Sequence, residues 1–379
     1  MKIIAWYLPQ FHTIPENDKW WGEGFTEWRN VKNGKQYFPD QYQPKIPLNG
    51  NYYNLLDDDV KEWQIQLARE NGVYGFAMHH YWFDGHLLLE KPMEQYLANP
   101  KLDLPFCVCW ANEHWTNQWV ADDQKILIEQ HYGEEKEWKQ HFEYLLPFFQ
   151  DPRYIRVNKK PLMIIYRPEL IGCLNEMVDC WQQLARENNL PGLCMAYQGR
   201  KWDHFDKDDS RFELDIEYQP GLIFDWKIQS SILMKIRNCI PARVEKVLER
   251  PIRWVGHLVQ RRTNRHNSQM SYDEVWQNIL KLKPNSCKSV PGAFVNWDNT
   301  PRKGKRGIYL SGSSPEKFQY YLEQQIRRAQ QDYHKDMIFL FAWNEWAEGG
   351  YLEPDEKYQD SYLHAIKRAL KNTQTWPWE

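Results

Sequence analysis

The segment Phe339-Leu-Phe-Ala-Trp-Asn-Glu-Trp-Ala-Glu-Gly-Gly350 joins an apolar run to two acidic residues near the C-terminus. The apolar residues from 337 to 343 predict a strand that is buried on both faces, and the glycine pair then ends it. Glu345 and Glu348 are therefore expected at the C-terminal end of a buried strand, among indole rings. Cleaving or rearranging a glycosidic bond needs two such acids, because one must donate a proton while the other stays ionised. The segment indicates a carbohydrate enzyme.

Short apolar runs alternate with helical patterns along the rest of the chain. This alternation is typical of a parallel sheet built from βα units, and eight strands is the number of a barrel. We predict an α/β fold, a (β/α)8 TIM-type barrel with loop and helical insertions. The predicted strands are 3–7, 74–79, 106–110, 162–166, 193–197, 214–218, 292–295 and 338–343. The predicted helices are 58–71, 134–149, 175–189, 315–333 and 361–371.

Polar and aromatic clusters favour the barrel over a doubly wound sheet more firmly than the strand count does. In a barrel, the C-terminal ends of the strands converge on one mouth, where such enzymes place their chemistry. An open sheet would spread the same residues along a wide edge. The clusters that follow predicted strands are Leu8-Pro-Gln-Phe-His12, His79-His-Tyr-Trp-Phe-Asp84, Trp110-Ala-Asn-Glu-His-Trp115, Tyr166-Arg-Pro168, Asn296-Trp-Asp-Asn-Thr-Pro-Arg302 and Asn344-Glu345.

The length and composition set limits on the class of protein. A chain of 379 residues fits one barrel domain over 1–379, and the net charge of -3 gives no reason to expect nucleic acid. The unusual values are 20 tryptophans and an aromatic content of 15%, and aromatic rings both fill cores and line ligand sites. Seven cysteines without paired CxxC motifs argue against a disulfide framework and a structural zinc site. We expect no cofactor.

Residues 226–268 depart from the barrel pattern. They contain ten Lys or Arg and only two acids, Glu245 and Glu249. We predict a basic helical insertion there, either a solvated face or a surface for peripheral contact with an anionic membrane or a phosphorylated substrate. The apolar run at the N-terminus is interrupted by Pro9, and no run approaches transmembrane length, so we expect a cytoplasmic protein.

Glu345 and Glu348 are the predicted catalytic pair. Glu113 is a rival partner for Glu345, because it also follows an asparagine at a strand end, and many retaining barrel glycosidases resemble this layout. The other interpretations of Glu113 are a ligand of sugar hydroxyls or the ion-pair partner of an arginine. The sequence has no P-loop, GxGxxG or GxSxG motif, which argues against nucleotide-phosphate cradles and serine hydrolase chemistry.

Other residues near the strand ends are predicted to bind substrate. The histidines have no third ligand at helical spacing, so hydrogen bonding is favoured over a metal site. Adjacent strand residues point to opposite sides, so at most one of His79 and His80 should face the pocket. Trp20 and Trp21 accompany Glu23 and Glu27 in a first loop that is either a sugar platform or packing. The predicted substrate-binding residues are His12, Trp28, His80, Tyr81, Trp110, Asn112, Glu113, Trp115, Trp297, Asp298, Arg302, Asn344 and Trp346.

The chain resembles the WbsX family nearly from end to end. Members of that family are described as glycosyltransferases of surface-polysaccharide loci and as glycoside hydrolase family 99-like proteins. Related endo-α-mannosidases are (β/α)8 barrels with an Asn-Glu-Trp-His-Glu-Gly motif, in which Ala347 of this chain replaces the histidine. The resemblance is carried by Trp6-Tyr-Leu-Pro-Gln-Phe-His12, Trp21-Gly-Glu-Gly-Phe-Thr-Glu-Trp28, His80-Tyr-Trp-Phe-Asp84, Phe106-Cys-Val-Cys-Trp-Ala-Asn-Glu113, Gly292-Ala-Phe-Val-Asn-Trp-Asp-Asn-Thr-Pro-Arg302 and Trp343-Asn-Glu-Trp-Ala-Glu-Gly349.

The resemblance implies roles for the two acids and a glycan substrate. Glu345 would be the base that deprotonates the sugar 2-hydroxyl, and Glu348 the general acid. The 2-hydroxyl then displaces the leaving group to form a 1,2-anhydro sugar, which water opens with net retention. The leading hypothesis is a retaining, endo-α-mannosidase-like glycoside hydrolase acting on an oligosaccharide or polysaccharide.

Two alternatives remain at this stage. The first is a glycosyltransferase of lipopolysaccharide, O-antigen or other surface-polysaccharide biosynthesis, which the basic insertion favours and the lack of a DxD signature opposes. The second is a non-catalytic glycan-binding barrel.

Overall fold

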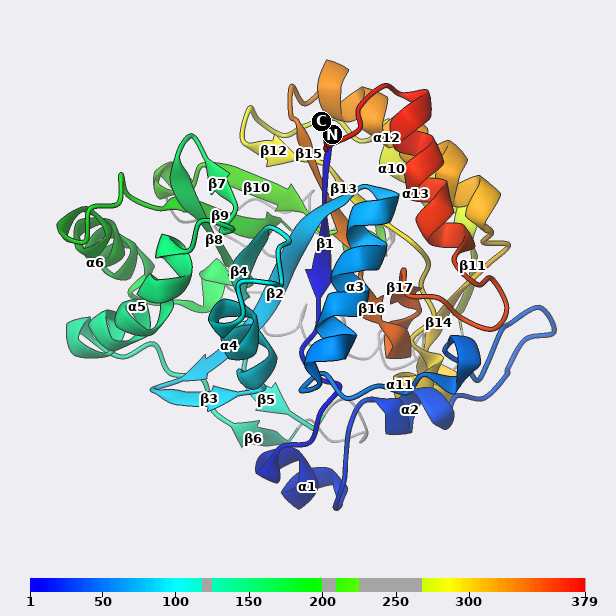
Figure 1. The fold of residues 1–379 in the computed structure, drawn as a ribbon, viewed down its shortest axis with the longest axis horizontal. Helices are drawn as coiled ribbons and strands as arrows, with labels where there is room; N and C mark the ends of the chain where they lie inside the picture. The colour runs from blue at the N-terminus through cyan, green and yellow to red at the C-terminus, as the bar shows by residue number, and fades with distance from the viewer. Residues whose placement is uncertain (118–124, 200–208, 225–267, 379) are drawn as a thin grey trace, which may run out of the picture.

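The computed structural model of the protein describes residues 1–117, 125–199, 209–224 and 268–378, and its centre is a ring of parallel strands (Figure 1). Hydrogen bonding places the strands side by side in the order β12, β10, β9, β8, β4, β2, β1, β15 and β13. The bounds are β1 (Lys2–Tyr7), β2 (Val73–Phe83), β4 (Phe106–Trp110), β8 (Lys160–Ile165), β9 (Cys194–Gly199), β10 (Leu214–Glu217), β12 (Ser289–Val290), β13 (Gly292–Phe294) and β15 (Met337–Phe341).

The ring is completed by a strand that proline divides into two short pieces. β12 pairs with β10 and β13 pairs with β15, and only Pro291 separates β12 from β13. Proline has no N–H to donate to a ladder, so the strand changes partners at this residue. The Pro291 carbonyl still accepts a hydrogen bond from the Phe339 N–H at 3.3 Å. This closure confirms the predicted (β/α)8 fold class.

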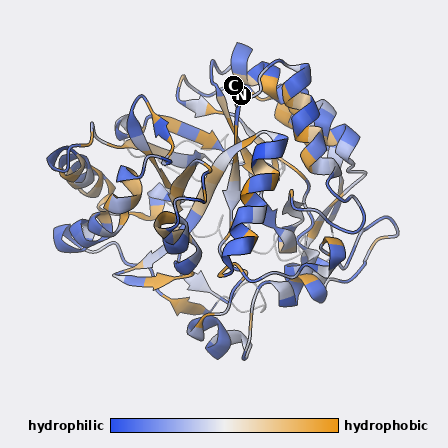
Figure 2. Cartoon of the chain, in the orientation of Figure 1, coloured by the Kyte–Doolittle hydropathy of each residue, from blue (hydrophilic) through white to orange (hydrophobic). Residues whose placement is uncertain are grey.

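Helices cover the outside of the ring, with hydrophobic residues toward the strands and hydrophilic residues outward (Figure 2). In α12, the buried residues Phe318, Leu322, Ile326 and Ala329 recur at helical spacing and form the stripe that faces the barrel. The helices of the outer layer are α3 (Asp58–Asn71), α4 (Lys91–Ala98), α5 (Glu135–Gln150), α6 (Leu174–Glu187), α10 (Tyr272–Lys281), α12 (Pro315–Gln331) and α13 (Ser361–Asn372).

Local sequence signals explain where two of these helices begin and end. α3 ends at Gly72, which adopts the left-handed conformation (φ 82°) that glycine reaches without steric cost. α12 begins with Pro315 after Ser314, whose hydroxyl accepts a hydrogen bond from the Lys317 N–H. The predicted helices are found within two residues of their expected bounds, whereas α4 and α10 were not predicted.

Short helices and strands lie outside the ring, mainly near the C-terminal ends of its strands. β2 runs past its predicted end at residue 79 because its last residues pair with antiparallel β3, for example Tyr81 with Leu88. The helices are α1 (Pro15–Trp21), α2 (Trp28–Lys32), η1 (Leu48–Gly50), η2 (Pro168–Leu170), η3 (Asp209–Arg211), α11 (Thr300–Lys303), η4 (Gly304–Arg306) and η5 (Trp346–Glu348). The strands are β3 (His86–Leu88), β5 (Trp115–Thr116), β6 (Ile126–Ile128), β7 (Arg156–Val157), β11 (Ser268–Ser271), β14 (Ile308–Ser311), β16 (Asn344–Glu345) and β17 (Gly350–Tyr351).

The predicted basic insertion, residues 226–268, lies outside the described residues except for Ser268, where β11 begins. Its helical character and its proposed membrane contact therefore stay predictions. Among the helices that the structure describes, none combines the length and the apolar character needed to cross a membrane.

Gly292 provides a test of how tightly the ring closes. A Cβ atom at this position would lie 1.8 Å from the Glu217 carbonyl oxygen of β10, which is backbone and cannot move aside. We expect Gly292→Ala to destabilise the protein by about 1–3 kcal/mol or more, because the barrel must open locally to admit the methyl group. Chemical denaturation measures this loss. The matched control is Gly172→Ala, whose Cβ would meet no atom within 4 Å; equal stability of the two variants would contradict the close approach.

Candidate active site

The segment that carries Glu345 and Glu348 folds back at the C-terminal end of β15. The chain forms β16 at Asn344–Glu345, turns through η5, and returns as β17, which pairs antiparallel with β16. The buried Asn344 side chain fixes this turn against the end of β1. Its Oδ1 accepts a hydrogen bond from the Leu8 N–H at 2.8 Å, and its Nδ2 donates to the Leu8 carbonyl at 2.9 Å. The two acids therefore lie at the barrel mouth on an anchored turn.

A single buried guanidinium joins three carboxylates at this mouth. Arg302, on α11, contacts Glu345 with Nη2 and Glu348 with Nη1, each at 3.0 Å. Its Nε donates a hydrogen bond to Glu27 at 2.7 Å. The Arg302 side chain is 3% exposed, so its charge needs these partners. Because one guanidinium reaches both acids of the η5 turn, their carboxyl groups face the same small space.

Burial and excess negative charge set the protonation of Glu345. Its side chain is 5% exposed, and burial raises its pKa to about 8. Arg302 opposes this rise, whereas the negative charges of Glu348 and Glu27 add to it, and the Gln10 Nε2 hydrogen bonds at 3.2 and 3.4 Å oppose it. Burial also works against the guanidinium, but the facing carboxylates raise the pKa of Arg302 well above its usual value. The cluster therefore binds a proton more tightly than an isolated glutamate does.

A fourth carboxylate, Glu353, holds the two tryptophans that bracket Glu345. Trp343 Nε1 donates to it at 3.1 Å and Trp346 Nε1 at 2.7 Å. Tyr53 and Gln64 donate to the same carboxylate at 2.8 and 2.7 Å. Burial raises the pKa of Glu353 to about 7, and these hydrogen bonds oppose the rise. The hydrogen bonds to Glu353 thus fix the Trp343 and Trp346 rings, which flank Glu345 in the sequence, and so stabilise the turn.

The carboxylates open into a cavity of about 390 Å³, within the range that ligand sites occupy. Aromatic rings form much of its wall, which suits a ligand with apolar C–H faces. These rings belong to Trp21, Phe25, Tyr81, Trp115, Tyr166, Tyr218, Trp297 and Phe341. The polar residues that accompany the acids are Gln10, Asn17, Asn30, His79, Glu113, His114, Arg302 and Lys303.

Seven of the residues predicted for the site line this one cavity. They lie at or after the C-terminal ends of β2, β4, β13 and β15, as expected where strand ends converge on a barrel mouth. These residues are Tyr81, Glu113, Trp115, Trp297, Arg302, Glu345 and Glu348. Glu113 also makes an ion pair with Arg167 at 2.7 Å, which was one of the interpretations open for it from the sequence.

Three predicted residues on β2, on β4 and just after β4 do not line the cavity. Two of them pack against the helix layer, and the third joins two loops. His80 Nε2 lies 2.9 Å from His141 Nε2 of α5, so His79 is the member of that pair that faces the cavity. The Trp110 ring lies against His141 at 4.8 Å between ring centres. Asn112 is fully buried and joins two loops, since it donates to the Arg167 carbonyl and accepts from the Arg167 N–H, both at 2.7 Å.

Five other predicted residues also lie outside the cavity wall. His12 is buried, with Nδ1 3.1 Å from the Thr13 carbonyl, and Asn344 anchors the turn as described above. Trp28 donates to the Tyr53 carbonyl at 2.8 Å and packs on Trp346, which Glu353 holds. Asp298 turns away from the cavity and lines a second pocket on the other side of its loop.

Several cavity residues were not among the predicted substrate-binding residues. The most consequential is Glu27, the third partner of Arg302, which the sequence indicated only as part of an acidic and aromatic loop. Gln10 lies within the first polar cluster, and Tyr166 and Tyr218 directly follow β8 and β10. Their position after apolar runs was the available signal. Within the described ranges, no three His, Cys, Asp or Glu side chains are grouped so as to hold a metal ion.

The fold and the site define a (β/α)8 barrel with acidic residues meeting in an aromatic cavity at the mouth. A family model described as "Glycosyltransferase WbsX" matches residues 3–366. The chain therefore belongs to the WbsX family.

Two curated relatives come from strains of Xanthomonas campestris pv. campestris, and both are described as "Uncharacterized protein WxcX". They are 33% and 34% identical to this chain over 97% of its length. The match covers 49% of each relative, so the chain spans about half the length of these curated relatives.

Solved structures with a similar fold include carbohydrate hydrolases. One, described as a glycoside hydrolase-like protein, has a TM-score of 0.55 at 14% identity, over 97% of this chain and 93% of that chain. Two structures of the GH99 endo-α-mannosidase from Bacteroides thetaiotaomicron, one with bis-tris-propane, have TM-scores of 0.53 and 0.51 at 13% identity. Each covers 98% of this chain and 97% of that chain. At such identities the similarity establishes the fold alone.

The raised pKa of Glu345 predicts a pH-dependent cost to stability. Between the ordinary pKa of 4.5 and about 8, the folded protein holds a proton that the unfolded chain releases. The stabilisation of the folded protein by protonated Glu345 is complete below pH 4.5 and is lost as pH rises through about 8. Wild type should therefore lose up to about 1.4 kcal/mol per pH unit more than Glu345→Gln over this range.

Denaturation of both proteins between pH 5 and pH 9 measures this difference. The exposed Glu143→Gln on α5 serves as the control, because it should follow wild type at every pH. Parallel curves for wild type and Glu345→Gln would contradict the raised pKa.

Proposed function

We propose that this chain is a carbohydrate-active enzyme whose catalytic acids are Glu345 and Glu348. The observation that carries the proposal is the contact of both carboxylates with the buried Arg302 guanidinium, in a cavity lined by aromatic rings. Acids positioned by one arginine keep a fixed spacing, which acid–base catalysis at a single bond requires. The aromatic wall supports a glycan as the substrate.

The reaction that fits best is retaining hydrolysis of an α-linked mannose-type glycan through a 1,2-anhydro sugar. Glu345 takes the proton of the 2-hydroxyl, and the 2-oxygen attacks the anomeric carbon as the bond to the leaving oxygen breaks. Glu348 donates a proton to that leaving oxygen. Water then opens the three-membered ring, with the two acids in reversed roles, and the product keeps its starting configuration. In an α-mannoside the 2-hydroxyl is trans to the leaving group, as this displacement needs.

The environment of Glu345 supports its role as the base. A carboxylate becomes a stronger base as its pKa rises, and burial raises the pKa of Glu345 to about 8. Glu348 has the more accessible side chain, at 13% exposure, on the turn after Glu345. An acid at that position can take its proton back from the water molecule that opens the anhydro ring. These roles also agree with those that the family resemblance implies.

A glycosyltransferase of surface-polysaccharide synthesis is the second candidate, because the matching family model carries that description. The same two acids would then activate a sugar acceptor in place of water. Incubation with a panel of nucleoside diphosphate sugars and a glycan acceptor separates the two activities. Release of nucleoside diphosphate that depends on the acceptor would identify a transferase, and glycan cleavage without an activated donor would identify a hydrolase.

Substitution of the two acids tests the proposed chemistry. Glu345→Gln and Glu348→Gln should each lower kcat on an α-mannan oligosaccharide by at least about 100-fold, since general acid–base catalysis contributes about 10²–10⁴-fold. Glu143→Gln, an exposed change on α5, should keep wild-type turnover. Glu113→Gln tests the rival pairing. If that variant is inactive while Glu348→Gln turns over normally, the acid is Glu113.

The pH dependence of kcat/KM tests the raised pKa of Glu345. The base must be ionised while the acid is protonated, so the profile should be bell-shaped, with one limb near the raised pKa of Glu345, about 8. Initial rates from pH 5 to pH 9 measure this limb, after incubation controls establish that the enzyme survives each pH. A profile with no limb near pH 8 would contradict the raised pKa of Glu345.

A further inference from the structure

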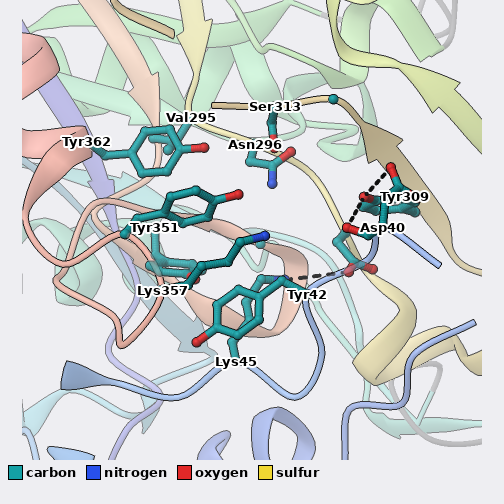
Figure 3. A pocket seen from close by; sticks show the side chains of 14 residues that line it. Asp40, Tyr42, Lys45, Val295, Asn296, Tyr309, Ser313, Tyr351, Lys357 and Tyr362 are labelled. Carbon is teal, nitrogen blue, oxygen red and sulfur yellow. Dashed lines mark hydrogen bonds and ion pairs between the residues drawn. The ribbon is translucent and has the colours of Figure 1, made fainter. Parts of the chain in front are cut away.

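A second pocket lies behind the loop that carries Glu348. It has a volume of about 220 Å³, and its wall combines the first loop, the segment after β13 and the C-terminal segment around β17. Figure 3 shows Tyr351 and Tyr362 on one side of this pocket and Tyr309 and Asp40 on the other. No step of the proposed reaction uses it.

Two segments of the chain, residues 297–298 and residues 348–349, separate this pocket from the catalytic cavity, and in each segment adjacent residues face opposite sides. Trp297 and Glu348 line the catalytic cavity, whereas their neighbours Asp298 and Gly349 line the second pocket. The Asp298 N–H donates a hydrogen bond to the Glu348 carbonyl at 2.7 Å and so joins the two segments. A ligand in the second pocket would therefore touch the backbone that positions the proposed acid.

Lys45 places a buried amino group in the pocket, and among the described residues no acceptor lies within hydrogen-bond distance of it. Its side chain is 4% exposed, and Nζ lies 3.7 Å from Asp298 Oδ2, beyond hydrogen-bond distance. Asp298 is already occupied, because Gln41 and Gln43 donate to the same oxygen at 2.9 and 2.8 Å. Burial lowers the pKa of Lys45, and Asp298 opposes that change. The ammonium group thus has donors to offer an oxygen atom of a ligand.

Asn296 contributes a buried acceptor on the same wall. Its Oδ1 has no hydrogen-bond partner among the described residues, and Figure 3 shows its amide group at the pocket with the nitrogen directed toward the lysines and the oxygen to the side. A group that satisfies both residues must accept from Lys45 and donate to Asn296. A hydroxyl group does both, whereas a carboxylate or a phosphate dianion only accepts.

The other lining residues also favour a neutral, polyhydroxylated ligand. Lys45 and Lys357 bring positive charge, and Asp40 and Asp298 bring an equal number of negative charges, so a charged ligand gains no net attraction. Aromatic rings complete the wall and offer faces for the C–H groups of a sugar. These rings belong to Tyr42, Tyr309, Tyr351, Tyr358 and Tyr362.

We propose that this pocket is an accessory sugar-binding site that holds one neutral monosaccharide unit, separated from the catalytic cavity by the 297–298 and 348–349 wall. The site rests on the proposed function only for the choice of a glycan as ligand. It gives the protein a second point of contact with a polymer, or with a second chain, next to the loop that carries Glu348.

Binding of simple glycosides in a Glu345→Gln background tests the site without turnover. Methyl α-D-mannoside and methyl α-D-glucoside are titrated into the full chain, and binding is followed by ligand-observed NMR. Lys45→Met removes the buried donor while keeping side-chain length, and Asn296→Ala removes an acceptor that has no hydrogen-bond partner among the described residues. At least one glycoside should bind, and each variant should weaken that binding at least tenfold. Lys136→Met, an exposed change on α5, should leave it unchanged.

The possible results separate this site from the proposed function. Glycoside binding that both Lys45→Met and Asn296→Ala weaken supports the site, whatever the turnover of the parent enzyme. Binding that neither variant alters, absence of glycoside binding, or binding of inorganic phosphate that displaces the glycoside would each overturn it. Unfolding curves of the variants establish that they are folded, and Asn296→Ala keeps the test decisive if Lys45→Met does not fold.

Discussion

The organisation of this site depends on one buried arginine. Arg302 is 3% exposed and meets Glu27, Glu345 and Glu348, which the chain supplies from two distant segments. A guanidinium this deeply buried needs carboxylate partners, because leaving such a charge unpaired typically costs about 3–5 kcal/mol. The first loop, α11 and the η5 turn are therefore positioned together. The spacing of the two proposed catalytic acids is a consequence of that shared contact.

The scaffold supports this contact through polar groups that make no contact with the cavity. Asn344 ties the catalytic turn to the end of β1 at Leu8. Glu353 accepts four hydrogen bonds, two of them from the ring nitrogens of Trp343 and Trp346. Buried polar groups that are fully hydrogen bonded fix one arrangement of their neighbours. The residues Asn344 and Trp346, which the sequence suggested as substrate ligands, thus serve the turn that presents Glu345.

The sequence predicted the features that depend on local pattern. Apolar runs located all eight strands, and the position of Glu345 and Glu348 after such a run placed them at the barrel mouth. It could not identify Glu27 as a partner of Arg302, because 275 residues separate them and only the closed barrel brings them together. It also placed His80 rather than His79 among the substrate-binding residues, whereas His79 lines the cavity and His80 contacts His141. That choice depends on the register of β2 against its neighbours, which decides which of two adjacent side chains faces inward.

The charge of the cluster suits the chemistry of a glycosidic bond. Three carboxylates face one guanidinium, so with one proton on the pair of proposed catalytic acids the group carries excess negative charge. Glycosyl transfer passes through an oxocarbenium-like transition state, in which positive charge develops on the sugar ring. An electronegative cavity stabilises that charge more than it stabilises the neutral ground state. The same argument applies whether water or a sugar hydroxyl receives the glycosyl group, because both reactions develop positive charge at the anomeric carbon.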